Sequence, residues 1–176
     1  MRVFPDDTIE PAKASDAGRS VVPMATDEEI RSDLIGDSGT GVSRALVLAV
    51  KSLTEWPVDA FFVDVGDDRE MVGWIKGTLV GFVNAEGAGD EGEVRGNLYH
   101  LSRVQAVRVS VNVVEDGMRL RANRGVTVVF GPDDELSVDI GAFRNKHYQN
   151  RADEFISTLI LRLAGLQPGL GIGVAP

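Results

Sequence analysis

Apolar residues first recur at helical spacing near the middle of the amino-terminal half, at Leu46, Ala49, Val50 and Leu53. This spacing predicts a helix over residues 43–55, with Ser43 as its amino-terminal cap and Trp56-Pro57 as its end. The run 45–50 is apolar on every side, which indicates burial on more than one face. Before it, a stretch poor in large apolar side chains predicts an extended arm with at most a short helix at Asp27–Leu34.

From Val58 onward the apolar period changes to two, which is typical of β-strands. A first strand centred on Val63 is expected to turn at 66–69 into the segment 70–84, read as one long or bent strand. Three glycines fall every fourth residue in this segment, at Gly73, Gly77 and Gly81. We interpret them as bulge or bend positions. An acidic, glycine-rich loop is predicted for 85–96.

The next segment predicts an antiparallel meander. A two-residue turn at Asp116-Gly117 would place Val113 opposite Leu120. A three-residue turn at 123–125 would then set the following strand on the same apolar face. A further turn at 131–134 leads to a fourth alternating strand.

A final amphipathic helix is predicted over 149–164, ended by Gly165 and Pro168. We expect it to cover the apolar face of the meander. The fold class is therefore α+β: an antiparallel β-meander or partly open barrel closed by a C-terminal helix, preceded by one helix and an extended N-terminal arm. The expected organisation is an acidic arm (1–40), a single α+β domain (41–165) and a Gly- and Pro-rich tail (166–176).

Composition narrows the chemistry. The 176 residues include no cysteine and two histidines, which excludes disulfides and thiolate catalysis and leaves little for a metal centre. We expect no cofactor and no metal. No apolar run is long enough to span a bilayer and the first residues lack a signal-peptide core, which predicts a soluble, cytoplasmic protein. The net charge of −9 opposes general binding to free nucleic acid.

The candidate motifs favour structural interpretations. Residues 36–43 have the outer glycines and serine of a phosphate loop, but Val42 stands where the lysine is required, so a helix-entry turn is expected. His100 and His147 are the only imidazole bases and have no orienting carboxylate beside them in the sequence. Four carboxylates around 64–70 lack the spacing of a calcium loop, so a solvated turn is expected.

The best candidate binding patch is cationic. Arg108, Arg119 and Arg121 are predicted to share the polar face of the meander, and further basic residues are expected around its edge. The tentative site for an anion or a partner consists of Arg108, Arg119, Arg121, Arg124, Arg144 and Lys146. The alternative is that these side chains pair with Glu135, Asp139 or the acidic arm.

Several β-strands closed by one carboxy-terminal amphipathic helix, over residues 58–165, resemble a pleckstrin-homology-like superfold. The resemblance is architectural and rests on no residue motif. It implies a domain that binds lipids, peptides or proteins rather than a catalyst. The turn at 66–69 is acidic where a phosphoinositide-binding domain would be basic.

We therefore expect a non-enzymatic structural subunit of a larger homo-oligomeric or multi-protein assembly, such as a component of a virus or phage particle. Its partners would be copies of itself or other protein subunits. One alternative is a monomeric binding module that uses the arginine face. The other is an enzyme with an unrecognised site of Asp, Glu and Arg.

Overall fold

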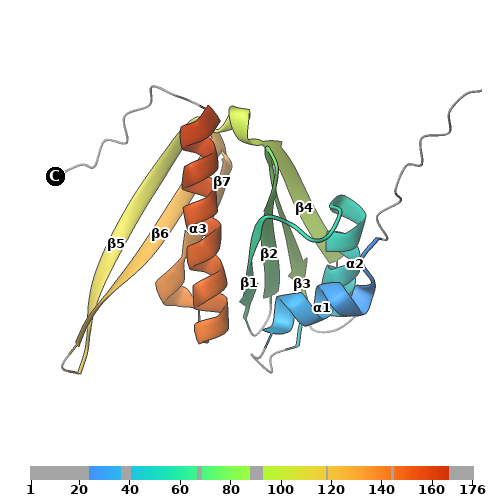
Figure 1. Ribbon diagram of the computed structural model, residues 1–176, viewed down its shortest axis with the longest axis horizontal. Coiled ribbons are helices and arrows are strands. Elements are labelled where there is room, and N and C mark those ends of the chain that lie inside the picture. Colours follow the sequence, from blue (N-terminus) through green and yellow to red (C-terminus); the bar gives the residue numbers. More distant parts are fainter. Residues whose placement is uncertain are drawn as a thin grey trace, which may run out of the picture.

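The computed structural model describes residues 24–36, 41–66, 69–87, 93–117, 119–143 and 145–166. Its helices are α1 (Asp27–Ile35), α2 (Arg44–Leu53) and α3 (Lys146–Leu166), with short 3₁₀ turns η2 (Leu101–Arg103) and η3 (Ile140–Ala142). The strands are β1 (Ala60–Val65), β2 (Arg69–Lys76), β3 (Leu79–Glu86), β4 (Glu93–His100), β5 (Ala106–Asp116), β6 (Arg119–Gly131) and β7 (Asp134–Asp139). They form two antiparallel sheets, ordered β1-β2-β3-β4 and β5-β6-β7. The predicted α+β class with a closing C-terminal helix is confirmed, and the described strands form no closed barrel (Figure 1).

Two helices precede the first sheet, and α1 occupies the place of the short helix that the sequence allowed at Asp27–Leu34. In α1, the Thr26 side chain accepts a hydrogen bond from the Glu29 backbone N–H, and the Glu29 carboxylate accepts one from Thr26, which completes a capping box. Ile30 and Leu34 of α1 are buried in the core, although this span was predicted as part of the arm. The cap of α2 by Ser43 is confirmed, since its hydroxyl accepts from the Leu46 N–H.

The segment 70–84 is a hairpin, so the prediction of one long strand is wrong. β2 and β3 pair without a register shift, and the chain reverses at Gly77, which has a positive φ of 59°. Gly73 and Gly81 are not bulges. A Cβ at either position would overlap an aromatic ring on the neighbouring strand, at 2.1 Å from Phe62 and 2.4 Å from Trp74. These two glycines make room for rings in the core.

Aromatic side chains join the layers of the fold. Phe62 of β1 contacts Phe155 of α3 edge-on, with 4.9 Å between ring centroids. Tyr99 of β4 stacks on Phe130 of β6 at 4.1 Å, which ties the first sheet to the second. The other face of the first sheet is covered by α1 and α2 (Figure 1).

The second sheet differs from the predicted meander in one strand. β6 runs through residues 123–125 without a turn, so 119–131 is one strand and the sheet has three strands. Asp116 pairs with Arg119, and Val113 therefore lies opposite Ala122 rather than Leu120. The slip is two residues along β6. Because side chains alternate, the same residues still share each face.

The closing helix starts earlier than predicted. Asn145 accepts a hydrogen bond from the Tyr148 N–H at 2.8 Å and caps α3, which then runs from Lys146 to Leu166. It packs most closely on β1 and also contacts β6 and β7. None of the helices in the described ranges is long and apolar enough to cross a bilayer.

Candidate functional site

The distal part of the β5–β6 hairpin extends beyond the rest of the second sheet. β7 pairs with β6 only from Gly125 onward, so residues 119–124 of β6 have β5 as their single described strand neighbour. Figure 1 shows this end of the hairpin diverging from α3. We call residues 109–116 of β5 and 119–124 of β6 the projecting hairpin.

One face of the projecting hairpin is mostly apolar and exposed. The register places five apolar side chains on it, together with the charged Glu115 and Arg124; the apolar ones are Val109, Val111, Val113, Leu120 and Ala122. Val111 is 57% exposed, Val113 64% and Leu120 75%. The same face continues toward the base of the sheet as Val126 and Val128, which are buried. The apolar pattern of the sequence therefore corresponds to one face of the sheet. Only the part of this face near the base of the sheet is buried in the structure.

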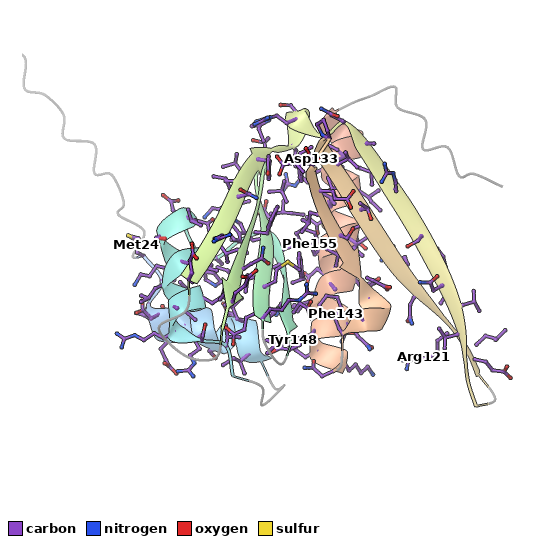
Figure 2. The ribbon with its side chains drawn as sticks, turned by 180° about the vertical axis from the view of Figure 1, so that it is seen from behind. Met24, Arg121, Asp133, Phe143, Tyr148 and Phe155 are labelled. Atoms are coloured by element: carbon purple, nitrogen blue, oxygen red, sulfur yellow. The ribbon has the colours of Figure 1, made fainter. Side chains whose placement is uncertain are left out.

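The opposite face of this hairpin is more polar. Ser110, Asn112 and Arg121 lie on it together with Val114. Figure 2 shows Arg121 near the distal end of the hairpin, far from Phe143 and Phe155 in the core. A strand with one polar and one apolar face normally buries the apolar one, so the exposed valines need a partner surface.

The projecting hairpin is attached to α3 by a charged contact at its base. Arg124 donates from Nε to Asp153 Oδ1 at 3.0 Å and from Nη2 to Ser157 Oγ at 2.9 Å. Beside this contact lies a shallow groove of about 420 Å³ between β6, η3 and α3. Amide and carboxylate side chains line most of it, including Asn123, Gln149 and Glu154. The Arg124 contact fixes where the hairpin leaves the body of the molecule.

The predicted cationic residues do not gather at one point. Arg108 and Arg121 share a face, as predicted, but they lie far apart along it. Arg108 of β5 lies opposite Thr127, whereas Arg121 of β6 lies opposite Val114. Six residue steps separate these positions, which corresponds to roughly 20 Å along the strand. Arg108 also lies 3.7 Å from the Glu135 carboxylate.

The other members of the predicted patch are dispersed as well. Arg124 lies on the opposite, α3-facing side of the sheet, where it binds Asp153. Arg119 is the first residue of β6, and Lys146 is the exposed first residue of α3. Arg144 lies outside the described residues. Of these residues, the four whose side chains the structure describes, Arg108, Arg121, Arg124 and Lys146, lie at separate places on the fold.

The remaining candidates form structural contacts. The Nδ1 atom of His100 lies 2.7 Å from the Ser102 hydroxyl, at an exposed turn. The ring of His147 packs closely against Gly36, at the end of α1. The Glu70 carboxylate accepts the Ser43 N–H at 2.9 Å, ahead of α2. Among the described residues, no group of three His, Cys, Asp or Glu side chains is arranged to hold a metal ion.

Of the other carboxylates around 64–70, one forms an ion pair and two lie outside the described residues. Asp64 lies 3.4 Å from the Arg69 guanidinium. Asp67 and Asp68 fall outside the described residues, as does the inner part of the phosphate-loop-like segment, residues 37–40.

Tyr99 carries a buried hydroxyl that links the two sheets. Its O–H donates to the Asp134 carboxylate at 2.8 Å. Burial raises the pKa of the Tyr99 phenol, and the hydrogen bond and the charge of Asp134 raise it further. The phenol is therefore held protonated, as a donor that joins β4 to the start of β7.

Comparison with known proteins gives no relative from which a site could be transferred. The chain matches no protein-family model, and it has no significant match among curated proteins or solved structures. The resemblance to pleckstrin-homology-like domains therefore stays a prediction. Any function has to be argued from the surface itself.

Proposed function

We propose that the protein is a non-enzymatic subunit of a larger homo-oligomeric or multi-protein assembly, and that it contacts its neighbours through the apolar face of the projecting hairpin. One observation carries the proposal. Val111, Val113 and Leu120 are each more than half exposed, although they lie on two strands that pair in a regular register. Isolated exposed apolar residues are ordinary, whereas a contiguous row marks an interaction surface.

The size of this face indicates what kind of contact it makes. A two-stranded ribbon of eight residues measures roughly 26 Å by 10 Å, so its flat area is on the order of 260 Å². A stable binary interface buries about 800 Å² on each partner. The projecting hairpin is thus too small to hold a partner alone. It fits a subunit that has several neighbours, each contributing part of the buried area.

The proposal predicts a change in assembly when the apolar face becomes polar. In a Val111→Thr, Val113→Thr double variant both side chains stay β-branched, so the strand itself is retained. Each hydroxyl buried in an apolar contact without a partner costs about 1 kcal/mol or more. Two of them should therefore raise the dissociation constant of the assembly roughly 30-fold.

The measurement is the mass of the purified full-length chain by size-exclusion chromatography with light scattering, over a wide concentration range. We expect a mass well above 18.9 kDa for the wild type and a shift toward 18.9 kDa for the double variant. The matched control is Asn112→Thr with Val114→Thr on the opposite face of β5, which should leave the mass unchanged. A wild-type chain that stays monomeric at all concentrations and with its native partners present would overturn the proposal.

A further inference from the structure

The outer edge of β5 is the second unusual feature of the projecting hairpin. β5 pairs with β6 along its whole length of 11 residues, and no other described strand pairs with it (Figure 1). It contains no proline, and it pairs with β6 residue by residue without a bulge. Natural edge strands that stay unpaired are usually interrupted by such features, because a regular edge offers its backbone donors and acceptors to another strand. The edge of β5 is therefore suited to the addition of a strand.

The side chains along β5 favour one particular partner, which is a second copy of the same strand. Apolar and polar residues follow a near-palindromic order centred on Ser110: residues at equal distances on either side of it are of the same kind, out to five positions. The matching pairs are Val109 and Val111, Arg108 and Asn112, Val107 and Val113, Ala106 and Val114, and Gln105 and Glu115. A strand with this order can pair antiparallel with its own copy and bring residues of the same kind together at every position.

The symmetry of such a pair limits its register. Most homodimers are related by a two-fold axis, and an axis normal to the sheet sets the two β5 strands antiparallel and keeps each face of the sheet on its own side. Directly opposite residues of an antiparallel pair lie on the same face. Since side chains alternate between the faces, the axis has to pass through a residue rather than between two residues. Only a few registers along β5 are then left to compare.

The neighbouring registers create mismatches that the register centred on Ser110 avoids. Moving the axis one residue toward the distal end of the hairpin sets Glu115 opposite the partner's Val107. Moving it one residue toward the base sets Gln105 opposite the partner's Val113. Parallel pairing in the same register would set Arg108 beside the partner's Arg108 and Glu115 beside the partner's Glu115, and like charges directly opposite each other are destabilising. The antiparallel register through Ser110 has none of these contacts.

The paired edges supply one contact of limited size. An edge of 11 residues is roughly 35 Å long and a sheet is about 10 Å deep, so each copy would bury on the order of 350 Å². This is less than half of the area that a stable binary interface buries on each partner. The pairing also joins the two apolar faces side by side in one six-stranded sheet, ordered β7-β6-β5-β5-β6-β7. The joined face has roughly twice the area of a single projecting hairpin, and further neighbours can bind to it.

We infer that two copies of the chain pair their β5 strands antiparallel about a two-fold axis through Ser110, so that Val109 lies opposite the partner's Val111 and Arg108 opposite the partner's Asn112. This inference rests on the proposed function, which it deepens by naming one neighbour of the subunit and the contact between them. Main-chain hydrogen bonds hold the two edges together, and the matched side chains set the register.

Cysteine cross-linking tests this register directly, because the chain has no cysteine of its own. Two Ser110 residues on the axis would have their Cα atoms about 4.5–5.5 Å apart, which is within the range of a disulfide. Two Asn112 residues would lie four positions apart along the strands, at roughly 13 Å or more, which is beyond that range. Both side chains are exposed on the same face of β5, so Asn112→Cys is the matched control.

The two single variants are oxidised in the full-length chain and compared on non-reducing gels. Ser110→Cys should form a covalent dimer at least about tenfold faster than Asn112→Cys. A rate for Ser110→Cys that is no higher than that of the control, including no dimer at all, would overturn the inference.

A pair of charge variants gives an independent readout of the same register. Ser110→Asp and Asn112→Asp each add one negative charge to the same exposed face of β5. Ser110→Asp sets two carboxylates opposite each other at the axis and should raise the dissociation constant of the dimer. Asn112→Asp faces the partner's Arg108 at two symmetric positions and should lower that constant roughly three- to tenfold. Light-scattering masses over a range of concentrations give both constants, and shifts in the same direction would contradict the register.

The outcomes separate this inference from the proposed function. A wild-type mass above that of one chain, together with equal cross-linking of the two cysteine variants, would reject the β5 pairing and leave the assembly in place. A wild-type chain that stays at the mass of one chain, also with its native partners present, would reject both.

Discussion

Replacement of Gly73 by alanine probes the packing of α3 on the first sheet. A Cβ at Gly73 would lie 2.1 Å from Cε1 and 2.6 Å from Cζ of Phe62. Phe62 is fully buried and lies between the rings of Phe143 and Phe155, so it cannot yield without moving α3. Overpacking of a core costs about 1–3 kcal/mol, and this site belongs at the upper end because the obstructing ring is supported from behind.

The expected net loss is smaller than the steric cost. Alanine restricts the unfolded chain and returns about 0.4–1 kcal/mol. We therefore expect Gly73→Ala to lower the free energy of unfolding by about 2 kcal/mol. At about 2–4 °C per kcal/mol for a domain of this size, the melting temperature should fall by roughly 4–8 °C.

The assay is thermal and urea unfolding followed by circular dichroism, with Gly41→Ala as the control. A Cβ at Gly41 meets nothing within 4 Å, so this variant should be neutral or slightly more stable. Phe62→Leu shortens the obstructing ring. In a double-mutant cycle it should therefore remove part of the cost of Gly73→Ala. A melting temperature within about 1 °C of the wild type, or strict additivity in the cycle, would refute the packing argument.

Two further variants test contacts that join elements of the fold. Tyr99→Phe keeps the stacked ring but loses the hydrogen bond to Asp134, and should cost about 1 kcal/mol. Because the pKa of Tyr99 is raised in the folded state, this stabilisation is fully present below pH about 10 and is lost as pH rises through the folded pKa. Denaturation between pH 8 and 11 should thus show a steeper alkaline loss for the wild type, and equal slopes would contradict this. Thr26→Ala removes the capping box with Glu29 and should cost about 1 kcal/mol, whereas Thr26→Ser should not; equal unfolding midpoints for the two would show that the cap is unimportant.

The elements with the strongest periodic patterns could be predicted from the sequence. The cap and course of α2, the alternation of β7 and the stripe of α3 follow from local spacing and from the residues at their ends. The faces of β5 and β6 were also predictable, because a slip of two residues in register preserves them. What these patterns share is that the deciding interactions are local.

The predicted roles of the glycines were wrong because a strand can require a glycine for more than one physical reason. It can need a positive φ at a turn, or it can need space for a side chain of the neighbouring strand. Gly125 was predicted to lie in a turn, yet it is buried in the middle of β6, where a Cβ would lie 2.6 Å from the Ser110 hydroxyl. Gly77 is the true turn residue between β2 and β3, with a positive φ. Telling close approach from turn formation requires the identity of the neighbour across the sheet. That neighbour is fixed only by the tertiary fold.

The predicted cationic patch stays a prediction, and the sequence pattern gives little support for a shared site. Alternation placed Arg108 and Arg121 on one face, and the register agrees. Alternation gives no distance along a face, and it does not reveal a partner from a distant element such as Asp153 of α3, which binds Arg124. Two basic residues on the same face of a sheet therefore need not belong to the same binding site. Side chains are brought together at one site by the loops and helices that cross the strands.

The exposed valines, by contrast, follow from where α3 packs, which no local pattern determines. The apolar stripe of α3 runs from Ala152 to Leu163, which is roughly 17 Å at 1.5 Å per residue. The apolar row on β5 runs from Val107 to Val113, which is six residue steps or roughly 20 Å. The two lengths are similar, so the helix is long enough to cover the row. It leaves the valines beyond Val107 exposed because it packs mainly on β1 of the first sheet.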